Sequence, residues 1–310
     1  MRIAIIGAGF CGLSAAWFLL QQKNCDVIIF DAKGIGGGAS GMAAGLMHPY
    51  AGKYGRRSLY ANEGMQATLE LIAIAQEQIA EPILLSKGII RHVENEEQRK
   101  VFLSHAKKYG DVEEISEDRF FLSSGVTIDC PSYLQGLWKA IEKRGGKLCK
   151  ERVDSIDALA AFDQVIIAAG GGIRQFPECA SLPIGVLKGQ VLECSGSSLA
   201  HSEIGSGYIA SRKESCYLGS TYEREFATEA PDSDIAQKEL LPKIASFFPA
   251  VDKLTMIGCQ AAMRVTRKGH YTPIAAQLSP RVWALTAMGS RGLLYHAYFG
   301  KTLAAAVGGL

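Results

Sequence analysis

The chain has 310 residues, which is long enough for two domains or for one large α/β domain with a cap. Hydrophobic residues make up 48% of it and charged residues 21%, as in an ordinary folded protein. A formal net charge of only +2 gives no sign of the large positive field of a dedicated nucleic-acid binder. The eight cysteines are scattered without a CxxC pair, which predicts reduced thiols in a reducing compartment. The six histidines show no HExxH spacing, so we predict no metal site.

The first twenty residues superficially resemble a secretory signal, because Met1-Arg2 precedes an apolar run. Gly7, Gly9 and Gly12 interrupt that run, however, and no cleavage-site pattern follows it. Nowhere else do eighteen uninterrupted apolar residues occur. We therefore expect no membrane span and a cytoplasmic protein.

Apolar runs and helical periodicity predict the elements in chain order. The chain opens with a strand at 3–6, a helix at 13–22, a strand at 27–30 and a Gly-rich segment at 34–41. There follow a helix at 60–80, a charged, strand-containing insertion at 81–125 and a helix at 131–144. Strands are then expected at 165–168, 186–194, 208–211 and 216–222, a helix at 236–248, a strand at 282–287 and a last helix to about residue 307. The Gly-rich segment is too flexible to be ordered without a ligand.

The clearest motif is a Gly7-x-Gly9-x-x-Gly12 turn that follows the first strand and opens the first helix. Gly7 permits the tight turn, Gly9 lets the backbone approach a pyrophosphate, and Gly12 lets helix and strand pack closely. The phosphates then meet free N–H groups and the positive helix end. Asp31, at the end of the next strand, is placed to accept hydrogen bonds from an adenosine ribose. This combination predicts a dinucleotide-binding βαβ unit.

We therefore predict an α/β fold with a discontinuous, Rossmann-like dinucleotide-binding domain and a smaller substrate domain on a mixed or antiparallel β-sheet. The dinucleotide-binding domain is expected to comprise residues 1–80, 126–182 and 258–310. The substrate domain is expected to comprise residues 81–125 and 183–257.

Four further segments resemble the D-amino-acid-oxidase-type FAD superfamily, which includes glycine oxidase and sarcosine oxidase. They are Asp31-x-Lys33, Gly38–Gly45 (Gly-Ala-Ser-Gly-Met-Ala-Ala-Gly), Asp163–Gly170 and Ala287–Leu293. The resemblance runs from end to end and is looser in the middle third. It implies that the dinucleotide is FAD.

The resemblance also assigns residues to the cofactor. In the family, the neighbourhood of Ser40 contacts the flavin side of FAD, and the Gly289–Leu293 turn places helix-start N–H groups near the flavin N1/C2 carbonyl. Some relatives attach flavin through a cysteine at the position of Ala262 here, so we expect non-covalent FAD. The implied FAD-binding residues are Gly7, Gly9, Phe10, Cys11, Gly12, Asp31, Ala32, Lys33, Ala39, Ser40, Ala44, Gly45, Val153, Ala169, Gly170, Gly289, Ser290, Arg291, Gly292 and Leu293.

On the substrate side, the resemblance assigns Arg264 to a substrate carboxylate, which a planar, two-pronged donor suits. Tyr208 and Tyr222, on paired strands, are further candidates for substrate binding, although a tyrosine on a strand is more often packing. His48 and His270 are assigned no role. The implied mechanism is hydride transfer to flavin N5 from the carbon next to a neutral amine, giving an imine that water hydrolyses. It requires no protein acid or base, so no catalytic residue is named.

The leading hypothesis is an FAD-dependent oxidase or dehydrogenase of a small amino acid or secondary amine. The alternative is a tRNA-modifying oxidoreductase that removes the carboxymethyl group from carboxymethylaminomethyl wobble uridine, with Arg264 holding that carboxymethyl group. The near-zero net charge favours a small-molecule substrate over tRNA. A non-catalytic redox-sensing module would leave the substrate-side strands unexplained, and an NAD dehydrogenase would leave Gly38–Gly45 unexplained.

Overall fold

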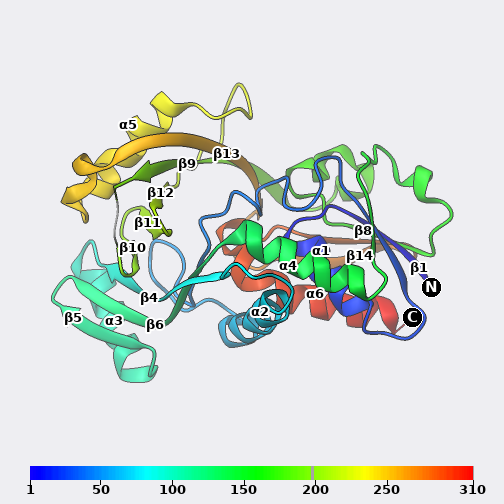
Figure 1. Cartoon of the computed structure of the whole chain (residues 1–310), viewed down its shortest axis with the longest axis horizontal. Coiled ribbons are helices and arrows are strands. Elements are labelled where there is room, and N and C mark those ends of the chain that lie inside the picture. Colours follow the sequence, from blue (N-terminus) through cyan, green and yellow to red (C-terminus); the bar gives the residue numbers. More distant parts are fainter. Residues whose placement is uncertain (197–198, 310) are drawn as a thin grey trace.

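Two β-sheets organise the chain, and Figure 1 shows them at opposite ends of its long axis. The computed structural model describes residues 1–196 and 199–309. Both ends of the described chain lie beside the first sheet (Figure 1). The α/β fold with two sheets confirms the predicted fold class.

The first sheet is the expected dinucleotide-type sheet, with strand order β14-β15-β8-β1-β2-β7. All neighbours are parallel except the edge pair β14 and β15. Ile3 and Ile5 are buried on one face, and Ala4 and Ile6 on the other, because a parallel strand is covered on both sides. The strands are β1 (Arg2–Ile6), β2 (Asp26–Phe30), β7 (Lys147–Cys149), β8 (Gln164–Ile167), β14 (Ile274–Ser279) and β15 (Val282–Thr286).

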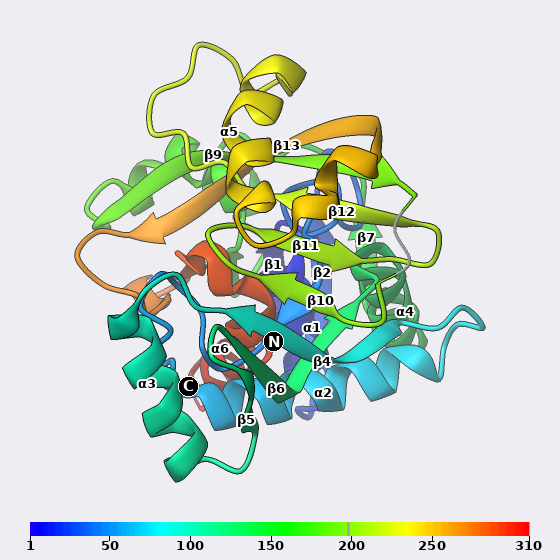
Figure 2. The ribbon, with the colours of Figure 1, turned by 90° about the vertical axis from the view of Figure 1, so that its left-hand side faces the viewer.

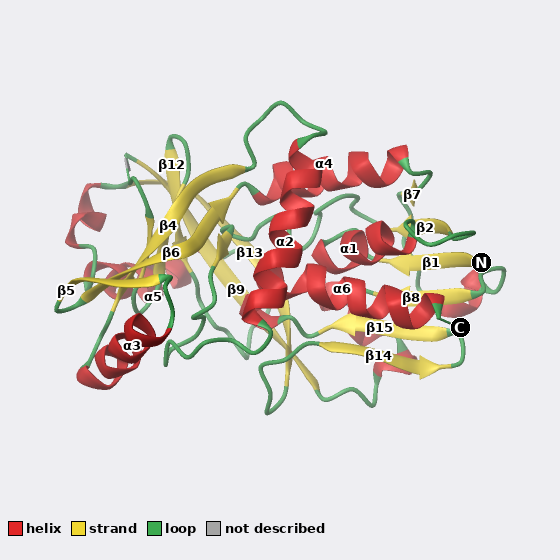
Figure 3. Cartoon of the chain, turned by 90° about the horizontal axis from the view of Figure 1, so that it is seen from below, coloured by secondary structure: helices red, strands yellow, loops and turns green. Residues whose placement is uncertain are grey.

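Helices cover one face of this sheet, as Figure 3 shows for α1, α4 and α6. They are α1 (Phe10–Leu19), α2 (Ala61–Gln76), α4 (Cys130–Lys143) and α6 (Gly292–Gly308), with α2 packed on α4 and α6. Short 3₁₀ turns cover the opposite face: η1 (Ile156–Leu159), η2 (Gly170–Gln175) and η3 (Pro177–Cys179). Two further turns are η4 (Pro249–Lys253) and η5 (Gly289–Arg291).

Among the described residues, the second sheet has nine strands, eight of them in the order β13-β9-β12-β11-β10-β4-β6-β3, with β5 added beside β6. Of its described strand pairs only β10–β4 is parallel, so the sheet is mixed, as predicted. The strands are β3 (Leu46–Met47), β4 (Leu84–His92), β5 (Val112–Ser116), β6 (Arg119–Ile128), β9 (Ile184–Ser195), β10 (Ser202–Ile204), β11 (Tyr208–Ser211), β12 (Ser215–Gly219) and β13 (Thr255–Arg267). Figure 2 looks onto this end of the molecule, where α3 (Glu96–Lys108) and α5 (Ser233–Ala245) flank the sheet.

The register of the second sheet determines which side chains share a face. Arg91 pairs with Ile204, Ile204 with Tyr208 and Tyr208 with Gly219, so these four residues point the same way. Following the register through β9 to β13 places Arg264 on this face as well. We call it the inner face. Its Ala210 and Tyr217 pack against Ala44 of the loop before β3, whereas α5 covers the other face through Leu240 and Ile244.

Strand pairing crosses the expected domain boundaries, which stay predictions. The boundary at 258 falls inside β13, which pairs with β9 from Thr255 to Arg267 and so belongs to the second sheet. The boundary between 125 and 126 falls inside β6, and β3 adds residues 46–47 to the same sheet. Pairing between distant segments joins these residues to the second sheet, and local composition does not reveal such pairing.

The insertion at 81–125 contains the helix α3 as well as the expected strands. Asn95 caps this helix by accepting a hydrogen bond from the Gln98 backbone N–H at 3.0 Å, and the Gln98 side chain accepts one from Glu94 N–H at 2.9 Å. Acidic residues occupy its first turn and basic residues its last, which complements the helix dipole.

Candidate active site

The glycine turn between β1 and α1 has no room for side chains. Gly7 has a φ of 113°, and a Cβ there would lie 2.3 Å from the carbonyl oxygen of Ala168. A Cβ on Gly12 would lie 1.8 Å from the Gly7 carbonyl oxygen. Strand and helix therefore approach as closely as a pyrophosphate cradle requires.

The start of α1 presents a hydrogen-bond donor toward the Gly-rich loop. Phe10 N–H donates to Ser40 Oγ at 3.0 Å, and a Cβ on Gly9 would lie 2.7 Å from the same oxygen. The first turn of α1 has no acidic residue, and Gly9 at its N-cap has no side chain, so no charged group within the helix neutralises its positive end. This arrangement suits a bound phosphate, with Ser40 beside it.

Asp31 joins the two loops of the dinucleotide-binding motif. Its carboxylate accepts hydrogen bonds from Ala8 N–H at 2.8 Å, Lys33 N–H at 2.8 Å and Gly34 N–H at 2.9 Å. A carboxylate offers about four acceptor positions, so a position remains for a ribose hydroxyl. Asp31 thus holds the backbone around the predicted adenosine site in place, in addition to the hydrogen bond with the ribose that is expected of it.

The other residues implied in FAD binding lie in loops next to the strands and at the start of α6. Ala32 and Lys33 follow β2, Ala39 and Ser40 lie in the loop that ends at Ala44 and Gly45, and Val153 lies in the loop after β7. Ala169 and Gly170 follow β8, while Gly289, Ser290, Arg291, Gly292 and Leu293 form η5 and the start of α6. Gly170 and Gly289 have φ values of 53° and 57°, and nothing lies within 4 Å of a Cβ built on Gly170. Open space beside Gly170 is what a neighbouring cofactor requires.

Phe10 and Cys11 anchor the start of α1 in the protein. The Phe10 ring lies 5.0 Å from the His296 ring of α6, between centroids, and Tyr133 Oη lies 2.7 Å from His296 Nε2. Burial raises the pKa of the Cys11 thiol to about 12, so the thiol is uncharged. Cys11 can therefore contribute to dinucleotide binding through its backbone and not as a thiolate.

The three residues predicted on the substrate side lie close together: Arg264 and Tyr208 on the second sheet, and Tyr222 beyond the end of β12. Arg264 Nη1 donates to Ser220 Oγ at 3.1 Å, and Arg264 Nη2 donates to the Thr221 carbonyl oxygen. The Arg264 guanidinium carbon lies 4.3 Å from the Tyr222 ring centroid, and the guanidinium rests on Gly189, where a Cβ would lie 2.1 Å from it. These contacts fix the guanidinium over the inner face.

Tyr208 lies beside this arginine. Its ring rests on Gly219, because a Cβ there would lie 2.3 Å from Tyr208 Oη. Burial raises the pKa of Tyr208 above its usual range; the Arg264 charge and a hydrogen bond with Ser220 oppose that rise only in part. The phenol is therefore neutral and able to donate a hydrogen bond. Tyr222, beyond the end of β12, is 56% exposed, so it covers Arg264 from the solvent side.

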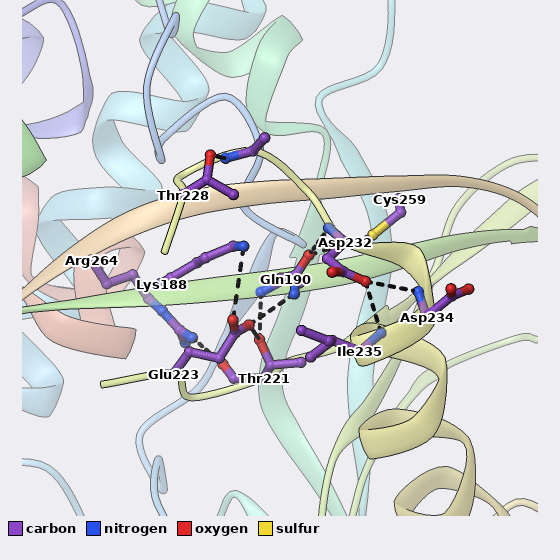
Figure 4. Close-up of polar contacts among 11 residues, drawn as sticks. Lys188, Gln190, Thr221, Glu223, Thr228, Asp232, Asp234, Ile235, Cys259 and Arg264 are labelled. Carbon is purple, nitrogen blue, oxygen red and sulfur yellow. Dashed lines mark hydrogen bonds and ion pairs between the residues drawn. The ribbon is translucent and has the colours of Figure 1, made fainter. Parts of the chain in front are cut away.

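A polar network braces the backbone to which Arg264 donates (Figure 4). Glu223 accepts hydrogen bonds from Thr221 Oγ1 at 2.7 Å and from Gln190 Nε2 at 2.8 Å, and its carboxylate lies 3.8 Å from the buried Lys188 Nζ. Lys188 and Gln190 alternate with Gly189 along β9, so they point to the face opposite Arg264. The network holds Thr221 in place without occupying the inner face.

Sequence reasoning missed Ser220, Arg91 and the position of His48. Ser220 follows Gly219 in a Gly-Ser-Thr run typical of a turn, and only the pairing of β12 with β9 and β11 brings it to Arg264. Arg91 interrupts the Ile-Ile-Arg-His run of β4, which was the available signal of a buried charge. Arg91 is only 3% exposed and His48 only 8%.

Comparison with known proteins identifies the family. The family model "FAD dependent oxidoreductase" (DAO) matches residues 2–306. The chain belongs to this family. It is therefore an FAD-dependent oxidoreductase, which confirms both the cofactor and the resemblance inferred from the sequence. The close-packed glycine turn and the start of α1, whose first turn has no acidic residue, fit that cofactor.

Two of the curated proteins that are similar to this oxidoreductase in sequence are an oxidase and a bifunctional protein. D-aspartate oxidase of Homo sapiens is 26% identical over 291 residues, which cover 86% of this chain and 82% of that protein. The tRNA 5-methylaminomethyl-2-thiouridine biosynthesis bifunctional protein MnmC of Maricaulis maris (strain MCS10) is 22% identical over 315 residues, 97% of this chain and 51% of that protein.

A solved structure supports the fold. The structure of iminodiacetate oxidase from Chelativorans sp. BNC1 superposes with a TM-score of 0.83 at 18% identity, covering 99% of this chain and 95% of that one. In residues 1–196 and 199–309, no helix is long and apolar enough to cross a membrane.

Proposed function

We propose that this oxidoreductase oxidises the C–N bond of an amino acid or secondary amine that bears a carboxylate. The observation that carries the proposal is the Arg264 guanidinium, which is held over the inner face by Ser220 and Thr221. The guanidinium is a fixed, planar cation on the inner face, and this face packs against the loop that contains Ala44. Such a cation suits a substrate carboxylate next to the flavin. The names of D-aspartate oxidase and iminodiacetate oxidase give their substrates as carboxylate-bearing amines, which supports the same class here.

In this proposal the protein contributes binding and orientation. Arg264 holds the carboxylate in a two-pronged contact, and the neutral Tyr208 phenol donates a further hydrogen bond. Tyr222 shields this contact from water. Arg264 and Tyr208 would hold the amine-bearing carbon in a fixed position relative to the bound cofactor. Substrate and cofactor then meet in one defined orientation.

Bound FAD would supply the two-electron acceptor for a hydride from the carbon next to the amine. Loss of that hydride from a neutral amine would leave a protonated imine on the substrate, which Arg264 and Tyr208 would still hold. Water would then add to the protonated imine and release a carbonyl compound and a protonated amine. A neutral amine needs no protein base for this step, so we assign no acid–base residue.

Product analysis tests this proposal. The FAD-loaded protein is mixed without oxygen with amino acids and N-carboxymethyl amines, and carbonyl products are trapped with phenylhydrazine. We expect one carbonyl compound and one amine for each flavin reduced. Flavin reduction without a carbonyl product would exclude C–N oxidation.

A second candidate is removal of a carboxymethyl group from a modified wobble uridine in tRNA. The match to the bifunctional MnmC protein favours it, because it spans 97% of this chain. Arg264 would then hold the carboxymethyl carboxylate. Under-modified tRNA, included beside the small amines, decides between the two: flavin reduction with release of glyoxylate by tRNA alone would replace the small-molecule proposal.

A further inference from the structure

The short segment that follows β12 has two sides with different contacts. On the inner face, Ser220 Oγ and the Thr221 carbonyl oxygen accept hydrogen bonds from the guanidinium of Arg264. The Tyr222 ring covers the same guanidinium. The side chains of Thr221 and Glu223 make their hydrogen bonds on the opposite face of the sheet, as alternation along an extended segment requires. The position of Arg264 therefore depends on what fixes this segment from the opposite face.

Hydrogen bonds on that opposite face close a ring around Thr221 (Figure 4). Gln190 N–H donates to Thr221 Oγ1 at 2.8 Å, and this hydroxyl donates to a Glu223 carboxylate oxygen at 2.7 Å. The same carboxylate oxygen accepts a hydrogen bond from Gln190 Nε2 at 2.8 Å. A backbone bond of 3.1 Å from Thr221 N–H to the Gln190 carbonyl oxygen runs beside the ring. Thr221 and Gln190 are fully buried, so water does not replace these bonds.

Two further contacts tie the ring to its surroundings. The other carboxylate oxygen of Glu223 lies 3.8 Å from Lys188 Nζ, and Lys188 is itself buried. Gln190 Oε1 accepts a hydrogen bond at 2.6 Å from the backbone N–H of Asp232, the residue that caps α5. The ring thus joins the segment that holds Arg264 to both β9 and α5.

Stability alone does not explain a polar ring at this place. Along the same face of β9, Leu192 packs in an apolar cluster with Leu240 of α5. Apolar residues of similar volume in place of a buried ion pair such as Lys188 with Glu223 are often neutral or stabilising. A buried polar network whose groups all have partners instead fixes its segment in one arrangement.

We propose that Thr221, Glu223 and Gln190 are positioning residues for substrate binding, because they fix the backbone oxygen to which Arg264 donates. The inference rests on the proposed function and deepens it. The three side chains lie on the face opposite Arg264, so they act through this arginine and not by touching the substrate. Without the ring, the guanidinium loses a fixed acceptor and no longer meets a carboxylate in one orientation. A misplacement of about 1 Å at a binding group can cost roughly 100-fold.

Acetate and acetamide test this role, because they differ in charge and little in shape. The FAD-loaded protein is titrated with each, binding is followed by the visible flavin spectrum, and the thermal midpoint is recorded separately. Thr221→Val keeps the shape of the side chain without its hydroxyl; it should bind acetate about 10- to 100-fold more weakly than the wild type and acetamide equally well. Thr221→Ser keeps the hydroxyl and should restore acetate binding. Thr228→Val, the same change at an exposed position of the following loop, should leave both affinities unchanged.

Two double variants test the ring in the absence of its charges. Lys188→Met/Glu223→Gln removes both charges and keeps a side-chain oxygen as the acceptor of the ring, whereas Lys188→Met/Glu223→Leu keeps no acceptor. Both should fold, because loss of a complete buried ion pair is often neutral or stabilising. We expect the first to bind acetate within about threefold of the wild type and the second about 10- to 100-fold more weakly. If Thr221→Val does not fold, this pair decides.

The proposal is overturned if Thr221→Val and Lys188→Met/Glu223→Leu lower the thermal midpoint but bind acetate as the wild type does, since the ring is then structural only. Its failure is separable from failure of the proposed function, which depends on Arg264 itself. Loss of acetate binding in Arg264→Met alone removes the positioning role and leaves the proposed function. A wild type that binds acetate no better than acetamide removes carboxylate binding at Arg264 and the positioning role with it.

Discussion

Replacing Arg264 with methionine removes the carboxylate-binding group and keeps most of its volume. The guanidinium has five N–H donors, and its contacts with Ser220 and the Thr221 carbonyl use two of them. The remaining donors suffice for a two-pronged contact with a carboxylate. Truncating one partner of such a desolvated pair costs about 2–5 kcal/mol, a fall of roughly thirty- to several-thousand-fold in kcat/KM.

Steady-state oxidation of a carboxylate-bearing amine measures this loss, with rates expressed per bound flavin. Arg264→Lys should restore only part of it, since an ammonium keeps the charge but not the two-pronged geometry. Arg267→Met is the matched control: this arginine lies three residues further along β13, on the opposite face by strand alternation. FAD content should stay near the wild-type level in all three variants.

The reasoning is refuted if Arg264→Met unfolds the protein or loses FAD while activity per bound flavin stays normal. Arg264 would then be a structural arginine that braces Thr221, and the main support for a carboxylate-bearing substrate would disappear.

Four further predictions follow from the same site. Gly12→Ala should abolish FAD binding, because its Cβ would lie 1.8 Å from a backbone oxygen, whereas Gly110→Ala, with open space, should keep a normal flavin-to-protein absorbance ratio. Gly189→Ala should raise KM at least tenfold with little loss of FAD, since its Cβ would displace the guanidinium above it; an unchanged KM would contradict this. Acid precipitation should release all the flavin as FAD, and flavin left in the pellet would show a covalent bond. The folded-state pKa values of His48 (about 3) and His296 (about 4) lie below the usual 6.5, because the folded protein favours the neutral imidazoles. The free energy of unfolding should therefore be highest above pH 6.5 and should fall as the pH drops toward 4, where the unfolded chain binds protons and the folded one does not. Equal free energies of unfolding in urea at pH 7 and pH 4.5 would refute this.

The parts of the molecule that depend on local sequence were predictable. The Gly7–Gly12 turn follows from a motif whose residues lie close together in the chain. The cluster of Arg264 with Tyr208 and Tyr222 follows from the resemblance to the family. Individual contacts of these residues with FAD and substrate stay predictions.

Other features depend on pairing between distant segments. Most of β13 is half-buried or exposed along its length, so strict apolar alternation is missing and its membership of the second sheet was not visible. The helix α3 buries only Gln98 and Phe102, too few for an apolar stripe, although the Asn95 cap was a readable signal. Arg91 is buried because β10 and β6 flank it, and neither strand adjoins it in sequence.

The most direct test of the central claim is anaerobic reduction of the bound flavin by amino acids and the amines that match them without the carboxylate. Suitable pairs are glycine with methylamine and sarcosine with dimethylamine. The FAD-loaded protein is mixed with each compound and its visible absorbance is followed. We expect the flavin band to bleach with at least one carboxylate-bearing member and to persist with its matched amine. Equal bleaching by both members of every pair, or bleaching by tRNA alone, would contradict the account.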